Sequence, residues 1–134
     1  VTASAVGLWN ARAKIATLIT LGTPQISCEK LTNKNLDFVN DNYPGAFYPE
    51  VRYICVAGKS IYGKKRFGHY LAYSSYQMIC GVGNTWGDGI TPVTAAHLAG
   101  AMNITIEGVK HSPNTAGIWY GSPEVRSQWV GYLS

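Results

Sequence analysis

Charged side chains are scarce in this chain. Asp, Glu, Lys and Arg make up 13% of its 134 residues, about half the share found in an ordinary globular protein. Hydrophobic residues reach 46%, which is enough for a packed core, and the length fits one domain. A chain with so few charges either buries much of what it has or is a piece cut from a larger core. Together with the first residue, Val1, this favours a fragment or a processed form of a larger protein.

Cysteine is also scarce, and its spacing excludes the common structural sites. Cys28, Cys55 and Cys80 are far apart and odd in number, and no Cys-x-x-Cys pair exists. A zinc site is therefore not expected, and any disulfide framework would leave one thiol over. Cys55 lies in an apolar run and is expected to be an inert core thiol. A reducing, intracellular compartment is the favoured interpretation.

Long apolar runs and dense basic stripes are missing as well. No run is long enough to span a bilayer as a helix. The net charge is +4, but the basic residues are scattered apart from Lys59 and the run 64–66. Nucleic-acid binding would need a denser stripe or a known motif and is not expected. Lys59 and the run 64–66 are interpreted as solvated residues of a loop, with peripheral contact to anionic lipid as the alternative.

Apolar runs alternate with turn residues along the chain in the manner of an α/β domain. Residues 15–21 and 51–57 are apolar and rich in β-branched side chains, which is typical of strands covered on both faces of a parallel sheet. Apolar and polar residues alternate over residues 103–109, which predicts a third strand. Residues 33–42 carry apolar side chains at helical spacing. Residues 94–102 are predicted to form a helical turn or two.

The remaining segments complete one α/β domain, residues 1–134. Residues 59–76 are basic and tyrosine-rich without clean periodicity, which predicts an excursion from the sheet in the form of a loop or lid. The tail begins with Ser122, a capping residue, followed by a proline, and this combination is typical of the start of a helix. One apolar helix face is predicted there from Val125, Trp129, Val130 and Leu133. The predicted fold class is α/β, with a mostly parallel sheet flanked by helices.

An aspartate and a histidine lie in loops of the kind that carry functional residues in an α/β fold. Asp88 lies on a Gly-Asp-Gly turn, where glycines allow close approach of the backbone, and His111 lies on the loop after the strand 103–109. We predict that Asp88 orients His111 and that His111 acts as a general base. The alternatives are a simple Asp-Gly turn and a loop histidine without a task. His69 and His97 are weaker candidates for the base.

The nucleophile that this pair would serve is predicted near the N-terminus. Ser4 follows a strand-like start and precedes Gly7. A nucleophile elbow has the pattern G-x-S-x-G because its strained turn needs small residues on both sides of the serine. Thr2 and Val6 occupy the two glycine positions here. An ordinary serine near a terminus is the alternative, and Cys80, which lacks an elbow, is a weaker candidate nucleophile.

Several short motifs follow one another in the chain. They are Thr20-Leu21-Gly22-Thr23-Pro24-Gln25, Val51-Arg52-Tyr53-Ile54-Cys55-Val56-Ala57-Gly58, Trp86-Gly87-Asp88-Gly89-Ile90-Thr91-Pro92, Ala96-His97-Leu98, Gly108-Val109-Lys110-His111-Ser112-Pro113 and Trp119-Tyr120-Gly121-Ser122-Pro123. In this order they resemble the C-terminal half of plant and cyanobacterial α/β-hydrolases of the lipase and GPI inositol-deacylase-like group. The resemblance covers residues 15–133, and the ordered set is more specific than any one motif.

The resemblance implies an α/β-hydrolase-like fold without its N-terminal strands, and a serine ester hydrolase with a Ser–Asp–His triad. Asp88 matches the acid and His111 the base. Ser4 matches the nucleophile, and the backbone N–H of Ala5 would give one oxyanion donor. The substrate would be an acyl ester or a lipid. Neither a metal nor another cofactor is expected, and the compartment would be the cytoplasm or a plastid.

The aromatic residues near the acid are the predicted substrate-binding residues. Phe67 and Tyr70 belong to the excursion, which would cover the site as a lid favouring apolar acyl groups. Trp86 lies beside Asp88 in the sequence. The alternative for the tyrosines of the excursion is packing on the sheet. The alternative function is a non-catalytic, truncated binding or interaction module, whose exposed sheet edge would invite self-association.

Overall fold

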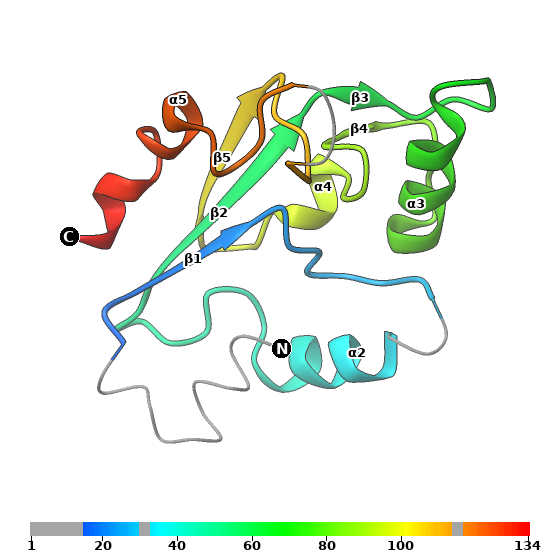
Figure 1. The fold of residues 1–134 in the computed structure, drawn as a ribbon. Helices are drawn as coiled ribbons and strands as arrows, with labels where there is room; N and C mark the ends of the chain where they lie inside the picture. The colour runs from blue at the N-terminus through cyan, green and yellow to red at the C-terminus, as the bar shows by residue number, and fades with distance from the viewer. Residues whose placement is uncertain (1–14, 30–32, 114–116) are drawn as a thin grey trace.

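The computed structural model describes residues 15–29, 33–113 and 117–134, and a parallel three-stranded sheet lies at its centre (Figure 1). The strands lie in the order β1-β2-β5. Their bounds are Thr17–Leu21 for β1, Arg52–Lys59 for β2 and Met102–Glu107 for β5. Both neighbouring pairs are parallel. The three predicted strands and their parallel arrangement are confirmed.

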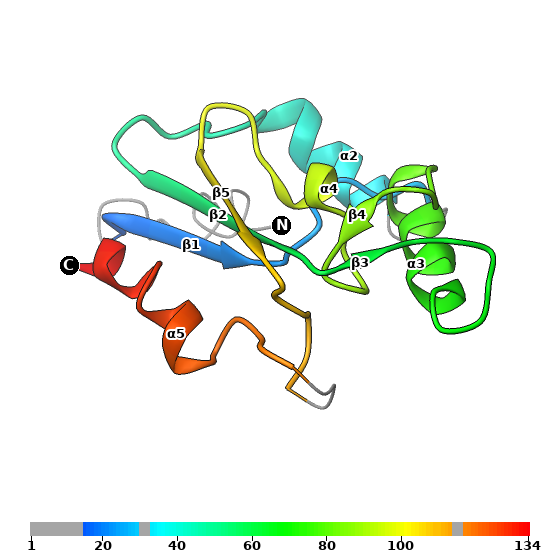
Figure 2. The same ribbon diagram turned by 90° about the horizontal axis from the view of Figure 1, so that it is seen from above.

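Helices cover the two faces of this sheet. α2 (Asn33–Asn42) connects β1 to β2 and lies on one face, as predicted for residues 33–42. α5 (Pro123–Arg126) and the 3-10 helix η2 (Val130–Leu133) lie on the other face (Figure 2). The predicted α/β class with flanking helices is therefore confirmed in its general form. No helix within the described residues combines the length and the apolar character needed to cross a membrane.

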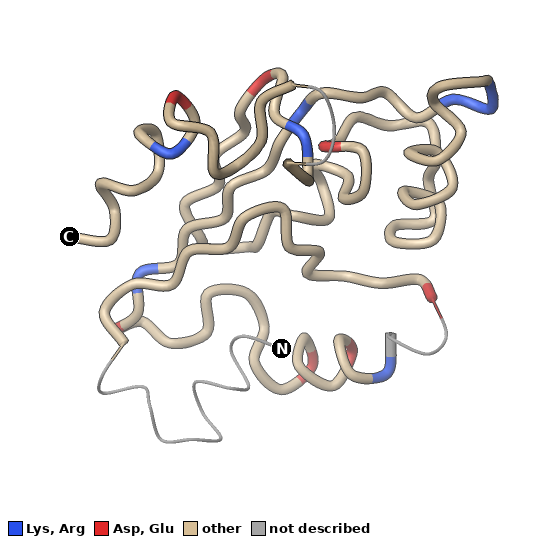
Figure 3. Tube along the Cα trace, in the orientation of Figure 1, with Lys and Arg blue, Asp and Glu red and all other residues tan. Residues whose placement is uncertain are grey.

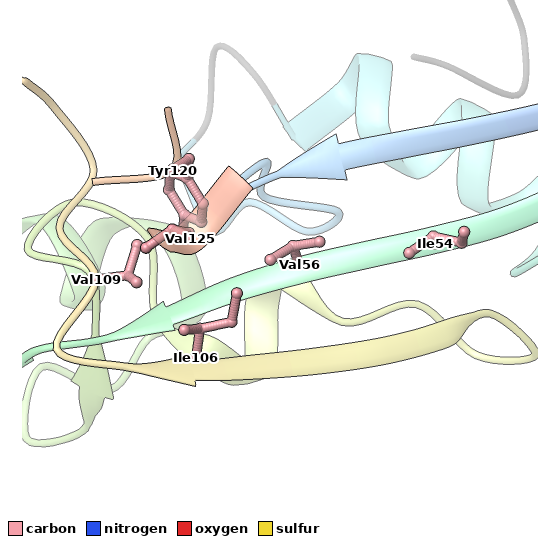
Figure 4. Close-up of a cluster of buried hydrophobic side chains, with 6 residues drawn as sticks. All are labelled: Ile54, Val56, Ile106, Val109, Tyr120 and Val125. Atoms are coloured by element: carbon pink, nitrogen blue, oxygen red, sulfur yellow. The ribbon is translucent and has the colours of Figure 1, made fainter. Parts of the chain in front are cut away.

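The central strand β2 is covered on both sides, which explains its continuous apolar sequence. Ile54 and Val56 are fully buried in a cluster on the α5 face, together with Ile106, Val109, Tyr120 and Val125 (Figure 4). Tyr53 faces the opposite side and packs in a second cluster with Tyr48 and Val51. Each fully buried side chain of this size stabilises the fold by about 1.5–3 kcal/mol. The sheet is therefore a firm base for the loops at its ends.

A smaller unit lies beyond the carboxyl end of β2. β3 (Ile61–Tyr62) and β4 (Trp86–Gly87) form an antiparallel ribbon, and α3 (Tyr70–Cys80) lies between them in the chain. Asp88 follows β4 directly. After a short α4 (Val93–Ala96), the chain returns to the sheet as β5.

The excursion has more regular structure than the sequence predicts, because its second half is the helix α3. Ala72 and Tyr76, one helical turn apart, are the buried residues of this helix. Leu71 and Met78 are apolar yet exposed, so they blur the helical pattern in the sequence. The helix ends at Gly81, whose φ of 74° is the left-handed conformation that glycine adopts readily.

The tail and the segment 94–102 also differ from their predicted helices. α5 is a single turn that begins at Pro123, and η2 follows after an interruption. Val125 is buried and Trp129 packs on the core, as predicted, but Val130 and Leu133 are exposed, so the predicted single apolar face is wrong for its second half. The change in helical phase brings Tyr132 onto the core in their place. In the other segment α4 ends at Ala96, and His97 is already extended.

Candidate active site

The two loops that carry Asp88 and His111 meet at the carboxyl edge of the parallel sheet. Asp88 follows the ribbon strand β4, and His111 lies shortly after the edge strand β5. The backbone N–H of His111 donates to the carbonyl of Asp88 at 3.0 Å, which fastens one loop to the other. The predicted proximity of these two residues is confirmed.

The carboxylate of Asp88 is buried and fully engaged. Its Oδ1 accepts hydrogen bonds from the backbone N–H groups of Ile90 (2.9 Å) and Thr91 (2.7 Å). This is a local turn in which an aspartate caps its own loop. The hydroxyl of Thr91 in turn donates to the carbonyl of Gly22 at 2.8 Å, next to β1. The loop is thus attached to the sheet as well as to itself.

The other carboxylate oxygen of Asp88 holds the histidine. His111 Nδ1 lies 2.9 Å from Asp88 Oδ2. A carboxylate only accepts, so Nδ1 carries the hydrogen of this bond and Nε2 of the neutral ring is left as the basic nitrogen. The side chain of His111 is 37% exposed, whereas that of Asp88 is not exposed at all. The pair thus presents an oriented imidazole to the surface.

The pKa of His111 is raised above its ordinary value. The hydrogen bond to Asp88 is the main cause, burial of the ring opposes it, and the negative charge of Asp88 adds to the increase. The charged imidazolium is therefore stabilised where it stands. This is the electrostatic requirement of a base that must accept a proton during a reaction.

Sequence reasoning missed a third side chain in this arrangement, Tyr120. Its hydroxyl donates to Asp88 Oδ2 at 2.7 Å and accepts from the backbone N–H of Gly58 at 2.8 Å. Burial, together with the neighbouring charge of Asp88, raises the pKa of Tyr120, so it remains a protonated donor. Tyr120 fixes the carboxylate from the side opposite the loop. Tyr120 belongs to the motif of residues 119–123 that contributes to the resemblance, but no residue pattern in the sequence indicates this role.

The close approach of β1 to the carboxylate depends on Gly22. A Cβ at this position would lie 2.6 Å from Asp88 Oδ2 and 2.6 Å from the Tyr120 hydroxyl oxygen. Its φ of +58° also lies in the left-handed region, which side chains rarely adopt. In the sequence, Gly22 directly after the apolar run 15–21 indicates only a turn. Its second role is to leave room for the acid.

A cavity of about 240 Å³ opens beside the pair. Asp88 and His111 line it from one side, and Leu71 and Ala72 of α3 line it from the other. The remaining lining residues are Ile61, Gly68, Gly89, Ile90, Lys110 and Ser112. Most of its surface is apolar, with the imidazole as the reactive group at its border. An apolar hollow with one convergent polar group is typical of a small-molecule site.

The predicted substrate-binding residues are distributed unevenly around this cavity. Phe67 and Tyr70 line a neighbouring hollow, which shares Gly68 and Leu71 with the cavity. Trp86 lies on β4, and its ring packs edge-on against Tyr62 with 5.4 Å between the ring centroids. Among the described residues, Trp86 does not line either of these two hollows. Ser4 and Ala5, the predicted nucleophile and oxyanion donor, lie outside the described residues.

The tyrosines of the excursion divide between the two predicted roles. Tyr76 is buried, donating to the carbonyl of Ile61 at 3.0 Å and accepting from the N–H of Gly89 at 2.8 Å. It therefore packs and supports the acid loop. Tyr70 is exposed and stacks on Tyr73, with ring centroids 6.3 Å apart. Only the exposed members are placed to meet a ligand.

His69 and His97 have hydrogen-bond partners outside the pair. His69 Nδ1 is 2.9 Å from the carbonyl of Tyr62, and His97 Nε2 is 3.2 Å from the hydroxyl of Thr105. Cys55 is 1% exposed, so the predicted core thiol is confirmed. Within residues 15–29, 33–113 and 117–134, no three His, Cys, Asp or Glu side chains gather in a way that could hold a metal ion.

Comparison with known proteins adds no assignment. No protein-family model, no curated protein and no solved structure matches this chain. The resemblance to α/β-hydrolases therefore stays a prediction, and the geometry of the site carries the functional argument.

Proposed function

We propose that this chain is a serine ester hydrolase in which His111 is the general base and Asp88 orients it. The observation that carries the proposal is the 2.9 Å hydrogen bond between His111 Nδ1 and the buried Asp88 carboxylate at the edge of an apolar cavity. The resemblance to the lipase and GPI inositol-deacylase-like α/β-hydrolases assigns these two residues the same roles. Ser4 is the proposed nucleophile.

The proposed reaction is acyl transfer in two steps. The hydroxyl oxygen of Ser4 attacks the ester carbonyl carbon while its proton passes to His111 Nε2. The imidazolium then gives that proton to the departing alcohol, which leaves an acyl-enzyme. Water attacks the acyl-enzyme with His111 again as base, and the carboxylic acid is released. The raised pKa of His111 supports this cycle because it favours the imidazolium that forms in each step.

The substrate class follows from the cavity walls. Ile61, Leu71 and Ile90 present apolar side chains next to the imidazole. An acyl chain would be held by these contacts, with its ester group at His111. We therefore propose an acyl ester or a lipid ester as the substrate, with no metal or cofactor in the reaction.

Hydrolysis of a chromogenic butyrate ester tests the proposal. The His111→Ala variant is expected to lose about six orders of magnitude in kcat, by analogy with other triads. His97→Ala is the matched control, because His97 is a half-buried histidine that bonds Thr105 instead of an acid. Both variants should be folded and equally pure. Equal rates for the wild-type chain and His111→Ala would refute catalysis by the pair.

A fluorophosphonate probe tests the nucleophile separately. It should label Ser4 in the wild-type chain, as found by mass spectrometry of the labelled peptide, and label much less in His111→Ala. Labelling of another serine would refute Ser4 without refuting the pair.

Should neither experiment show activity, the second candidate is a non-catalytic interaction module. The observation in its favour is that β1 pairs with β2 alone, so its other edge has no strand partner within the described residues. Such an edge can pair with another chain. Dimerisation measured by light scattering, in a chain with no esterase activity, would support this function.

A further inference from the structure

The turn between β3 and α3 carries an unusual combination of basic and apolar side chains. Lys64, Lys65 and Arg66 follow one another and are all exposed, and Phe67 comes next. Phe67 is 102% exposed, and Leu71, on the first turn of α3, is 85% exposed. Tyr70 between them is 57% exposed. We call residues 64–67 with Tyr70 and Leu71 the basic-aromatic tip.

The backbone conformation of the turn holds the side chain of Phe67 outward. The N–H of Arg66 donates to the carbonyl of Lys64 at 2.8 Å, and the N–H of His69 donates to the carbonyl of Arg66 at 3.1 Å. Gly68 adopts a φ of +81°, with nothing within 4 Å of where its Cβ would lie. These bonds hold the backbone on both sides of Phe67. With an exposed fraction of 102%, this phenyl ring is not packed against the part of the domain that the structure describes.

The charge around the tip is of one sign. Asp88 is the only acidic residue between positions 51 and 106, and it is buried. Figure 3 shows the basic run at the end of this turn, away from the acidic positions of α2 and α5. Two of the ammonium groups lie over tyrosine rings of the same unit, Lys64 over Tyr62 at 5.5 Å and Lys65 over Tyr73 at 5.2 Å. Two of the three positive charges of the tip thus lie against tyrosine rings of the same unit.

We propose that the basic-aromatic tip docks on an anionic lipid surface. The cations would meet the headgroups, and the side chains of Phe67 and Leu71 would enter the boundary between headgroups and acyl chains. A duplex nucleic acid or an acidic protein surface would meet the cations but would leave Phe67 and Leu71 in water. Unpaired bases could stack on Phe67 but would offer no apolar partner to the aliphatic Leu71, which is 85% exposed. The tip is continuous with the cavity beside His111, because Gly68 and Leu71 line both hollows. Docking would bring the cavity mouth to the membrane. This inference goes beyond ester hydrolysis and does not rest on it.

Co-sedimentation of the full chain with vesicles tests the docking surface. Phosphatidylcholine vesicles containing phosphatidylserine should bind the chain, and pure phosphatidylcholine should bind it much more weakly. The triple variant Lys64→Ala, Lys65→Ala, Arg66→Ala should bind anionic vesicles about a hundredfold more weakly, and added salt should mimic this loss. The double variant Phe67→Ser, Leu71→Ser should lose about tenfold at every salt concentration, because its loss is of apolar contact.

Two controls make the outcome specific. Phe38→Ser removes a phenyl group that is 59% exposed on α2, far along the chain from the tip, and should bind vesicles like the wild type. His111→Ala should also bind normally, so a failure of the catalytic proposal leaves this test intact. Absence of vesicle binding, or equal binding by the Phe67→Ser, Leu71→Ser variant and the wild type, would overturn the proposal.

Discussion

On one side of the cavity Asp88 is buried and both of its carboxylate oxygens accept hydrogen bonds, whereas on the other side Leu71 is 85% exposed. The acid side is attached to the sheet through Gly22, Gly58 and Tyr120. The helix side is attached mainly through Ala72 and Tyr76. The acid side can therefore hold an imidazole in a fixed direction, while the helix side offers an apolar surface that contributes little to the stability of the fold.

This difference decides how substitutions should act. A change on the acid side disturbs a network of buried polar groups, where an unsatisfied group costs about 1–3 kcal/mol. A change on the exposed helix side removes atoms that mostly contact solvent, and its effect on stability is expected within about 0.5 kcal/mol. Stability measurements can thus separate positioning residues from ligand-contacting ones.

The largest effect is expected for Gly22→Ala. The new Cβ would overlap Asp88 Oδ2 and the Tyr120 hydroxyl, and the residue would also be held at a positive φ. We expect the free energy of unfolding to fall by about 3 kcal/mol or more, from strain and overpacking together. Urea unfolding followed by circular dichroism measures it.

Gly68→Ala is the matched control for this substitution. Gly68 also has a positive φ, but its Cβ would meet nothing within 4 Å, so only the backbone strain of about 1 kcal/mol applies. Equal destabilisation by the two substitutions would show that close packing around the acid is not what Gly22 provides.

On the acid side, one contact of Asp88 can be predicted from the sequence and another cannot. The strands are predictable because apolar, β-branched runs such as 15–21 have few alternatives to a buried parallel strand. Parallel strands bring their carboxyl ends to one edge, so the meeting of Asp88 and His111 could be predicted. The contact between Asp88 and Tyr120 could not, because it depends on how the chain after His111 crosses the sheet. The helix α3 could not be predicted for a different reason, because its exposed apolar residues hide the helical spacing of its buried ones.

A smaller but sharper effect is expected in the titration of His111. Its pKa is raised chiefly by the hydrogen bond to Asp88, while burial alone would lower it. Asp88→Asn should therefore bring the pKa of His111 from above its ordinary value of about 6.5 to below it. NMR of the imidazole carbon-bound protons measures this directly. Burial lowers the pKa of His97, whose ring nitrogen Nε2 lies beside the hydroxyl of Thr105 and not beside an acid, so His97 should titrate alike in both proteins.

The sign of the pH dependence follows from the raised pKa. Protonation of His111 contributes stability that is fully present below the unfolded pKa of about 6.5 and is lost as the pH rises through the folded pKa. Catalysis needs the neutral ring, so kcat/KM should rise with pH over the same folded pKa. An unchanged pKa of His111 in Asp88→Asn would contradict the assigned cause.

The smallest effect on stability is expected for Leu71→Ser, on the helix side of the cavity. Because this side chain is 85% exposed, the free energy of unfolding should change by less than about 0.5 kcal/mol. By contrast, Val125→Ala removes two buried methyl groups from the core cluster and should cost about 2 kcal/mol. If Leu71 contacts the acyl chain of a substrate, its replacement should raise KM for long-chain esters more than for acetate esters, with kcat retained. A loss of stability in Leu71→Ser comparable to that in Val125→Ala would mean that the exposed side chain has a structural partner, and the distinction between the two sides of the cavity would fail.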